Sequence, residues 1–415
     1  MLLALPAAAQ EAGDAALAAP QISSATNGCG TATSIGSANV APVYVDGFPC
    51  ASNTGGVAFN QPYTNLKICV PGSTTNCQII DHVIVDSGSD GVRVAATALK
   101  SALLKALPAV TSGAKDLTEC ETYVDSFVYG PLKTVDLYIA GRSAKSVPVQ
   151  VFGTGSATGF AVPKACSSQG GSETDTVSDF GGNGLIGVAF DLTDSGPYFS
   201  CKANSSNCSA NGTYAGIPNV VSKFASDNNG AVMTLHTISS KGAAAAVSGS
   251  LIFGVGTKTN NTPPAGTTAI VNNSNGEFNL KVATTATSTA YIDSGTDDLV
   301  INDKNLTQCA SSSAGDSYFC PKSNTSLALG ISSYTTDTVA YSLSYTVANA
   351  TTLFSSNSGD DVAFDDLAEP ASADSALTGD YAMGLTTFFG RTMYFVFNGK
   401  SSSLGKGPIN AIWPQ

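Results

Sequence analysis

Two aspartates with matching surroundings are the residues of this chain best suited to carry chemistry. The first lies in the run Ile84-Val85-Asp86-Ser87-Gly88-Ser89, and the second lies in the run Tyr291-Ile292-Asp293-Ser294-Gly295-Thr296. Apolar residues typical of a strand precede each Asp, and a Gly followed by Ser or Thr comes after it. Because the glycine lets the chain turn sharply, we expect each carboxylate at the end of a strand, on the edge of a sheet.

These two aspartates predict hydrolysis by a pair of carboxyl groups that share one proton. Two carboxyl groups held about 3 Å apart cannot both ionise easily, so one of them keeps its proton. The ionised group can then activate a water as general base, while the protonated group polarises the bond that breaks. The hydroxyl groups of Ser89 and Thr296, three positions after each Asp, can orient the carboxyl groups. Asp86 and Asp293 are therefore the candidate catalytic pair.

The tripeptide Asp-Ser-Gly is not specific on its own. A third copy begins at Asp194, but it has no strand before it and continues into Pro197. Ordinary turns after strands would not explain the flanks that the other two copies share. Well downstream of each copy comes an apolar-apolar-Gly signal, Leu185-Ile186-Gly187 in one case and Ala382-Met383-Gly384 in the other. Two copies of the same ordered signals predict duplicated lobes.

Other catalytic chemistries find little support in the sequence. The chain has only two histidines, His82 and His236, and both lie in strand-like runs where we expect structural roles. No Gly-x-Ser-x-Gly turn accompanies them, so a serine triad is not indicated. No C-x-x-C pair occurs, and zinc-ligand spacing is absent. We expect no metal and no cofactor.

The elements that must position the two aspartates read mainly as short strands. Apolar runs bounded by Gly, Pro, Asn or Ser occur at residues 43–45, 66–70, 79–85, 135–139 and 147–152. One helix is expected at residues 96–107, ended by Pro108. The sequence therefore predicts an all-β protein with few helices.

A polar, proline-containing stretch at residues 257–268 is the best candidate for a linker. It separates the two Asp motifs and suggests three parts. Residues 1–28 are expected to be the remnant of a signal peptide and a flexible arm. We expect an N-terminal lobe at residues 29–258 with Asp86, and a C-terminal lobe at residues 259–415 with Asp293.

The bulk composition narrows the class of partner. The 415 residues suffice for two lobes with a sizeable core. Only 12% of them are charged, and the net charge is −12, with no basic patch. This balance argues against nucleic acid and against an anionic membrane surface as partners. No apolar run is long enough to predict a membrane span.

Export is the better explanation for the cysteines and the N-terminus. The chain begins with a short apolar stretch followed by small residues around Ala9, as at the end of a signal peptide. It contains ten cysteines, several of them close together, such as Cys69 with Cys77, Cys201 with Cys208, and Cys309 with Cys320. Disulfides between such local pairs are expected. We predict a secreted protein, either periplasmic or extracellular.

The two Asp motifs resemble those of the pepsin-like aspartic proteases, and most closely those of a bacterial family of secreted pepsin-like proteins. The resemblance spans roughly residues 40–410 and rests on the two runs apolar-apolar-Asp-Ser-Gly-Ser/Thr and the two apolar-apolar-Gly signals. It implies an all-β, bilobal double β-barrel with a few short helices. It also implies that Asp86 and Asp293 are catalytic and that the following residues support the two loops: Ser87, Gly88, Ser89, Ser294, Gly295 and Thr296.

The resemblance further implies a flap, the hairpin that closes over substrate in pepsin-like enzymes. Tyr129-Gly130 resembles the Tyr-Gly of that flap. Where pepsin-like enzymes usually carry a Trp that supports the flap, this chain has Arg93, which we expect to pair with Asp90 or to contact the flap tyrosine. Three further acids follow the catalytic motifs and either lie at a solvated loop edge or face the pair and raise its apparent pKa values: Asp90, Asp297 and Asp298.

The sequence leaves several functions open. The leading hypothesis is a monomeric aspartic endopeptidase that acts on peptide or protein substrates. One alternative is a pepsin-fold protein that binds a ligand or partner in its cleft, or sits on a surface, with weak or no catalysis. A glycosidase that uses Asp86 and Asp293 is another, and it requires carboxyl groups about 5 Å or more apart. The separation of the two groups therefore discriminates between these hypotheses.

Overall fold

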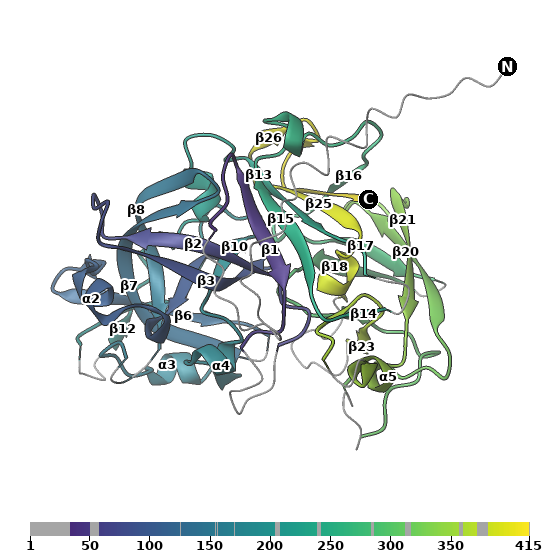
Figure 1. Cartoon of the computed structure of the whole chain (residues 1–415), viewed down its shortest axis with the longest axis horizontal. Helices are drawn as coiled ribbons and strands as arrows, with labels where there is room; N and C mark the ends of the chain where they lie inside the picture. The colour runs from purple at the N-terminus through teal and green to yellow at the C-terminus, as the bar shows by residue number, and fades with distance from the viewer. Residues whose placement is uncertain are drawn as a thin grey trace.

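The chain forms two β-rich lobes joined by a sheet between them. The computed structural model describes residues 34–49, 58–124, 126–153, 155, 157–169, 171–203, 208–238, 242–283, 286–311, 317–356, 360–371 and 381–414. Figure 1 shows the first lobe in purple to blue and the second in green to yellow, with β1, β13, β15 and β25 running between them. Strands are the commonest element among the described residues, and the helices are short, as the sequence predicts.

The first lobe is built from strands β2 to β12. Its longest hairpins are β2 with β3 and β7 with β8, which are antiparallel pairs. The strands are β2 (Tyr63–Cys69), β3 (Cys77–Asp86), β4 (Asp90–Ala95), β5 (Thr111–Ser112), β6 (Lys115–Thr122), β7 (Ser126–Ile139), β8 (Arg142–Phe152), β9 (Ser172–Glu173), β10 (Gly184–Val188), β11 (Tyr198–Cys201) and β12 (Cys208–Ala210). The helices among them are η1 (Ala96–Ala98), α2 (Ser101–Ala106), α3 (Lys164–Ser167) and α4 (Val177–Phe180).

The second lobe contains a seven-stranded sheet in the order β21-β20-β17-β18-β24-β19-β23. These strands are β17 (Phe278–Val282), β18 (Thr287–Ile292), β19 (Leu299–Ile301), β20 (Thr325–Ser332), β21 (Tyr341–Val347), β23 (Ala368–Pro370) and β24 (Tyr381–Met383). Helices α5 (Ala350–Phe354) and η5 (Leu385–Thr387) belong to this half. A two-stranded pair, β14 (Ala243–Ala244) with β22 (Ala363–Phe364), connects segments from both halves of the chain.

Six strands form an antiparallel series between the lobes, in the order β1-β15-β13-β25-β28-β16. They are β1 (Val40–Val45), β13 (Gly230–Leu235), β15 (Val247–Phe253), β16 (Ala269–Val271), β25 (Arg391–Val396) and β28 (Ile409–Pro414), and helix η2 (Val220–Lys223) precedes β13. A small hairpin, β26 (Ser401–Ser402) with β27 (Gly405–Lys406), lies between β25 and β28. This series takes strands from both sides of residue 258, where the sequence places the boundary.

The expected linker at residues 257–268 is partly ordered by side-chain hydrogen bonds. It contains the short helix η3 (Thr259–Asn261), and Asn261 is buried. The Asn261 carboxamide accepts hydrogen bonds from the backbone N–H groups of Thr257 and Lys258, at 2.9 and 2.8 Å, and donates to the carbonyl of Phe253 at 2.9 Å. The segment is therefore held against the end of β15 before it enters β16.

The helix expected at residues 96–107 is interrupted. The structure has η1 and α2 instead, with Leu99 and Lys100 in extended conformation between them. Gln78, on β3, stabilises the interruption because its side chain accepts a hydrogen bond from Lys100 N at 2.7 Å and donates to Ala98 O at 2.7 Å. Leu99, Leu103 and Leu107 are buried, so the interrupted segment still packs on the core.

Four disulfides lie among the described residues. Three join the local pairs that the sequence predicts: Cys69–Cys77, Cys201–Cys208 and Cys309–Cys320. The fourth, Cys120–Cys166, links β6 to α3. Cys29, Cys50 and the predicted signal-peptide remnant at residues 1–28 lie outside the described residues. Within the part that the structure describes, no helix is long and apolar enough to cross a membrane.

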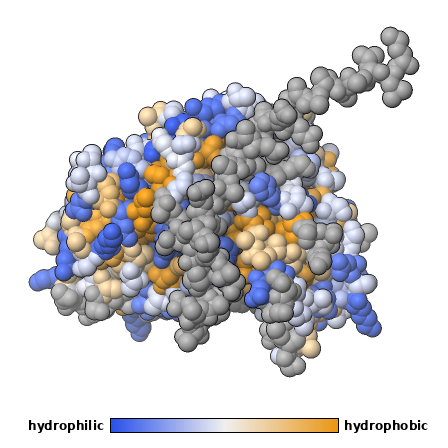
Figure 2. Space-filling model, viewed as in Figure 1, coloured by the Kyte–Doolittle hydropathy of each residue, from blue (hydrophilic) through white to orange (hydrophobic). Residues whose placement is uncertain are grey.

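One large apolar cluster extends through both lobes and the sheet between them. It includes Val85 beside the first motif and Ile292 beside the second, together with Phe278 and Phe395. On the face seen in Figure 2, hydrophilic residues lie around the outline, and hydrophobic ones show mainly toward the middle. The strands that end in the two Asp motifs are therefore anchored in the core, which fixes where their ends lie.

Candidate active site

The two Asp motifs occupy equivalent positions in the two lobes. Strand β3 ends at Asp86, and β18 ends at Ile292, immediately before Asp293. In the first lobe β10 runs parallel to β3 with Gly187 opposite Asp86. In the second lobe β24 runs parallel to β18 with Met383 opposite Ile292. Each Asp therefore lies at a strand end that is flanked by the predicted apolar-apolar-Gly strand.

Each apolar-apolar-Gly strand requires its glycine, because the backbone of the neighbouring Asp loop lies very close to it. A Cβ on Gly187 would lie 2.4 Å from the carbonyl oxygen of Ser89, and a Cβ on Gly384 would lie 2.1 Å from that of Asp298. Neither position has room for a side chain. The two apolar-apolar-Gly strands therefore pass directly beside the two Asp loops.

The two loops are tied together by reciprocal hydrogen bonds, which we call the cross-brace. The backbone N–H of Ser87 donates to Oγ of Ser294 at 3.0 Å, and the N–H of Ser294 donates to Oγ of Ser87 at 2.9 Å. Each hydroxyl also donates into the opposite loop, from Ser294 to Val85 O at 2.7 Å and from Ser87 to Ile292 O at 3.3 Å. The cross-brace is buried, so it fixes one loop relative to the other.

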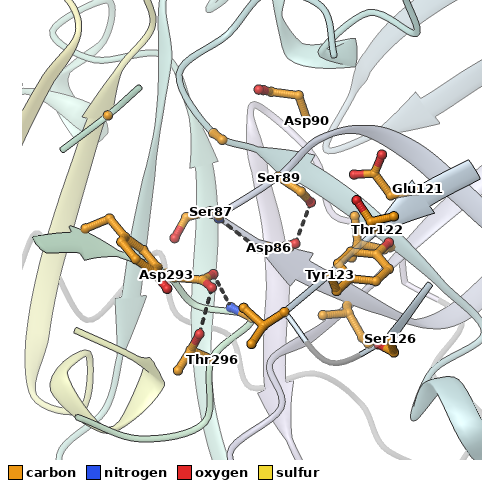
Figure 3. Close-up of a pocket in the computed structure, with 18 of the residues that line it drawn as sticks. Asp86, Ser87, Ser89, Asp90, Glu121, Thr122, Tyr123, Ser126, Asp293 and Thr296 are labelled. Carbon is orange, nitrogen blue, oxygen red and sulfur yellow. Dashed lines mark hydrogen bonds between the residues drawn. The ribbon is translucent and has the colours of Figure 1, made fainter. Parts of the chain in front are cut away.

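Each carboxyl group is held by the same two kinds of donor. Oδ1 of Asp86 accepts from Gly88 N at 2.7 Å, and its Oδ2 accepts from the hydroxyl of Ser89. Oδ1 of Asp293 accepts from Gly295 N at 2.8 Å, and its Oδ2 accepts from the Thr296 hydroxyl at 2.8 Å. Figure 3 shows these bonds on both sides of the pair. The structure thus places the loop residues that the sequence singled out around the two carboxyl groups.

The two carboxyl groups face each other across the loops. A Cβ on Gly88 would lie 2.6 Å from Oδ1 of Asp293, and a Cβ on Gly295 would lie 2.8 Å from Oδ1 of Asp86. Burial raises the pKa of Asp293 well above its usual value, and the charge of Asp86 and the hydrogen bond between the two side chains raise it further. Asp293 therefore holds a proton to higher pH than an ordinary aspartate.

The pair lies at the floor of a cleft with a volume of about 1270 Å³, lined by both lobes. The first lobe contributes residues of the Asp86 loop, of β6 and of α4, and the second lobe contributes residues of the Asp293 loop and the turn before β17. A cleft of this size can accept an extended peptide or another ligand larger than a single residue.

The hairpin over the cleft is formed by β6 and β7. Thr122 pairs with Phe127, so the turn begins at Tyr123, whose N–H donates to Ser126 O at 2.7 Å. Tyr123 and Val124 line the cleft, and Val124 is 42% exposed. In Figure 3 Glu121, Thr122 and Tyr123 lie on the hairpin side of the pair.

Tyr129 and Gly130, the residues expected at the flap, lie further along β7 and do not line the cleft. Tyr129 is fully buried, and its hydroxyl donates to Thr118 at 2.9 Å. Gly130 packs so closely on β8 that a Cβ there would lie 2.0 Å from Val151 O. The structure therefore moves the candidate flap tyrosine from Tyr129 to Tyr123, because the turn of the hairpin falls at residue 123.

Arg93 is fully buried beside the cleft, at the centre of three carboxylates that we call the Arg93 cluster. Its Nη2 lies 2.9 Å from Glu119 Oε1, 2.9 Å from Glu121 Oε2 and 2.9 Å from Asp194 Oδ2. Its Nη1 donates to the backbone carbonyl of Asp90 at 2.6 Å, so the expected partner is met through its main chain. Because Glu119 and Glu121 belong to β6, Arg93 joins the flap hairpin to the strand that follows the Asp86 loop.

Burial dominates the electrostatics of the Arg93 cluster. It raises the pKa of Glu121 to about 7, although the charge of Arg93 acts in the opposite direction. It also raises the pKa of Glu119 well above the usual value. The three carboxylates lie close enough to one another to suit a metal ion, but the Arg93 guanidinium already occupies the space between them. We therefore assign no metal to this cluster.

The acids that follow the motifs differ in their surroundings. Asp298 is fully buried, and neither of its side-chain oxygens has a hydrogen-bond partner among the described residues. Burial raises its pKa well above the usual value, and the charges of Asp297 and Glu369 add to this. Asp90 is held by a hydrogen bond from Asn219 at 3.0 Å. The expectation of a solvated loop edge is therefore wrong for Asp298.

The two histidines lie in structural hydrogen bonds, as the sequence predicts. His82 is buried between Asp46 and Asp81, 3.1 and 3.2 Å from their carboxylates. Burial lowers the pKa of His82, but the bonds to Asp46 and Asp81 outweigh it and leave the pKa raised. His236 lies 3.1 Å from the Ser248 hydroxyl.

The sequence does not reveal Tyr123 or the partners of Arg93. Apolar and polar side chains do not alternate from Leu117 to Thr122, so the local sequence gives no clear signal for the β6 hairpin. Asp194, set aside as a loop residue, contributes to the cluster through its side chain rather than to catalysis. No local signal connects Asp194 to Arg93, because the two residues are 101 positions apart.

Comparison with known proteins agrees with this architecture. A family described as "Protein of unknown function (DUF3443)" has a model that matches residues 36–412, so the chain belongs to that family. No curated protein matches the chain. Among solved structures, the chain is similar to an aspartic proteinase from Irpex lacteus, with 14% identity, a TM-score of 0.53, and coverage of 91% of this chain and 97% of that one. The likeness shows that the fold is bilobal and pepsin-like.

Proposed function

We propose that this member of the DUF3443 family is an aspartic endopeptidase in which Asp86 and Asp293 are the catalytic residues. The observation that carries the proposal is the geometry of the pair: two carboxyl groups, hydrogen-bonded to each other, on cross-braced loops at the floor of a two-lobed cleft. The pepsin-like fold of the chain supports the same reading.

The mechanism follows from which group holds the shared proton. Asp293, with its raised pKa, keeps the proton, and Asp86 is the carboxylate that accepts a proton from water. The water oxygen bonds to the peptide carbonyl carbon, while the Asp293 proton passes to the carbonyl oxygen. The C–N bond then breaks as the nitrogen takes a proton from Asp86 and the hydroxyl returns one to Asp293. The pair ends as it began.

The mutual hydrogen bond favours this route over the glycosidase alternative. A retaining glycosidase needs carboxyl groups about 5 Å apart, and an inverting one needs more, so that a sugar or a water fits between them. The hydrogen bond between Asp86 and Asp293 leaves no such gap, because hydrogen-bonded carboxyl oxygens lie only about 3 Å apart. Both carboxyl groups come from one chain, so a monomer suffices.

We further propose that the chain acts outside the reducing cytoplasm. Four disulfides lie among the described residues, and such bonds persist mainly in oxidising compartments. Two of them, Cys120–Cys166 and Cys201–Cys208, lie next to Tyr129 in the cluster behind the flap hairpin. Reduction should therefore loosen the hairpin.

A digest of a mixed peptide library tests the proposed activity. Wild-type protein, Asp86→Asn and Asp293→Asn are compared from acid to neutral pH, with the surface variant Asp337→Asn as control, because Asp337 is exposed and outside the cleft. We expect cleavage by wild type and control and a loss of at least about 1000-fold in each Asn variant. Cleavage that survives either substitution in the pair would exclude the mechanism.

A further inference from the structure

The ionisable side chains that line the cleft are predominantly acidic. Besides the pair, its lining includes Glu121 on the flap hairpin, Asp191 and Glu277 on connecting turns, and Asp297 and Glu369 in the second lobe. Among the described lining residues there is no Lys, Arg or His. A cleft lined by one sign of charge focuses its field and raises the local concentration of ligands of the opposite sign.

Neutral donors hold the acids where the two lobes meet, so their charge is not cancelled locally. Asp191 accepts a hydrogen bond from the Asn398 carboxamide at 3.3 Å, and Glu277 accepts one from the Asn273 carboxamide. The two turns touch, because a Cβ on Gly276 would lie 2.6 Å from the Phe190 ring. Asp191 and Glu277 therefore stand on adjacent segments of opposite lobes. No ion pair joins either of them to a cation in the part of the chain described here.

The Arg93 cluster at the other wall does not cancel this excess. Three carboxylates share one guanidinium, and two of them, Glu121 and Asp194, line the cleft. Glu119 behind them is fully buried, and its Oε2 has no hydrogen-bond partner among the described residues. Arg93 itself is fully buried, does not line the cleft, and is paired with these carboxylates, so it presents no uncompensated cation to a ligand.

Two side chains that line the cleft carry polar atoms without a hydrogen-bond partner. The Tyr123 hydroxyl and Oε1 of Gln61 are both buried, both belong to lining residues, and neither has a hydrogen-bond partner within the described residues. Buried polar groups are normally satisfied. Tyr123 lies on the flap, and Gln61 is tied to the Asp293 loop by a hydrogen bond from its Nε2 to Gly295 O at 3.2 Å. A peptide backbone between them would supply both a donor and an acceptor.

From these observations we infer that the cleft selects cationic peptides, segments rich in Lys or Arg. Asp191 and Glu277 are the specificity-determining residues that this inference names, and it rests on the proposed peptidase function. Opposite charges across the cleft favour encounter and correct register, and like charges are rejected. An acidic peptide would have to bring its carboxylates against those already on the walls.

Binding to a protein that cannot cleave separates the inference from the proposed activity. Asp293→Asn is suitable, because the amide imitates the protonated form that Asp293 holds. Three fluorescent peptides with one central sequence are compared, flanked by Lys, by Ser or by Glu, at low and at high salt. We expect the Lys peptide to bind about tenfold or more tightly than the Glu peptide at low salt, with most of the preference lost at high salt.

A second substitution locates the preference in the cleft. Glu277→Gln, added to Asp293→Asn, should lower the Lys preference about threefold, whereas Asp337→Asn, which removes one exposed negative charge elsewhere, should leave it unchanged. Equal binding of the three peptides, no binding of any, or an equal effect of both substitutions would overturn the inference. A Lys preference in binding without cleavage by wild type would uphold the inference and refute the peptidase. Cleavage by wild type without a Lys preference in binding would refute the inference and uphold the peptidase.

Discussion

The two Asp loops agree in the contacts that act on the carboxyl groups and differ in what stands behind them. In both, a backbone N–H and a hydroxyl hold the carboxyl group, and a serine contributes to the cross-brace. Behind the first loop, Arg93 gathers three carboxylates. Behind the second lies Asp298, buried and without a hydrogen-bond partner among the described residues. The position equivalent to Asp298 in the first loop is Gly91.

This difference separates what proton sharing requires from what each lobe can vary. The cross-brace and the paired donors must be symmetric, because a displacement of one loop would part the two carboxyl groups. The support behind each loop need only be rigid. One lobe has a buried ion cluster at this place, and the other has the buried carboxyl group of Asp298, whose raised pKa favours the neutral form.

The largest effect is expected from removing the cation of the first lobe. Arg93→Met leaves three carboxylates close together with no guanidinium, and breaking a buried ion pair in this way costs about 3–5 kcal/mol. Urea unfolding measures the loss of unfolding free energy. Lys145→Met is the matched control, because Lys145 pairs with Asp136 but is 53% exposed, and it should cost about 1 kcal/mol. Equal losses would show that the Arg93 cluster is not a special support.

The cross-brace should show a smaller, slightly unequal loss. Ser87→Ala and Ser294→Ala each leave the opposite buried N–H without its acceptor, at about 1–3 kcal/mol. Ser294→Ala should be the more destabilising, since its hydroxyl also donates at 2.7 Å where that of Ser87 donates at 3.3 Å. Thermal unfolding of both variants, with the exposed Ser344→Ala as control, gives the comparison. A larger loss for Ser87→Ala would reverse this ranking.

In the second lobe, replacing the carboxyl group of Asp298 with a neutral amide should stabilise the protein rather than destabilise it. The folded state keeps the proton of Asp298 above the pH at which the unfolded chain releases it. At pH values below the usual Asp pKa, Asp298 therefore does not change the free energy of unfolding. As the pH rises from there toward the raised pKa, the free energy of unfolding falls by at most about 1.4 kcal/mol per pH unit. Asp298→Asn removes this fall and should stabilise the protein at neutral pH by on the order of 1 kcal/mol.

Unfolding free energies of Asp298→Asn and wild type, measured from acid to neutral pH, provide the test. The two curves should converge at acid pH and separate as the pH rises. Asp337→Asn, at an exposed position, should follow wild type throughout. Parallel curves for Asp298→Asn and wild type would mean that Asp298 does not titrate abnormally.

The sequence predicts those parts of the site that depend on residues close together in the chain. Within a few positions, the Asp motifs and the apolar-apolar-Gly signals indicate strands, turns and close contacts. Because these signals occur twice in the same order, they also predict two lobes. Asp86 and Asp293 could therefore be paired before their distance was known. Repetition also separated them from Asp194, whose tripeptide is the same.

The features that the sequence does not predict depend on contacts between segments far apart in the chain. The Arg93 cluster joins residues 26 and 101 positions apart, and nothing in the local sequence marks such partners. The expected helix breaks because Gln78, from another strand, bonds to the backbone at Ala98 and Lys100. Tyr129-Gly130 was chosen as the candidate flap because it matches a short pattern, whereas the turn of the β6–β7 hairpin falls at Tyr123.

The pH dependence of kcat/KM for a cleaved peptide tests most directly whether Asp86 and Asp293 act as one pair with a single proton. The account predicts a bell-shaped profile, which falls in acid as the pair gains a second proton and falls at higher pH as the raised pKa of Asp293 is passed. Asp293→Asn should abolish the activity across the whole range. A profile without the high-pH fall, or one that Asp293→Asn leaves unchanged, would contradict the shared proton.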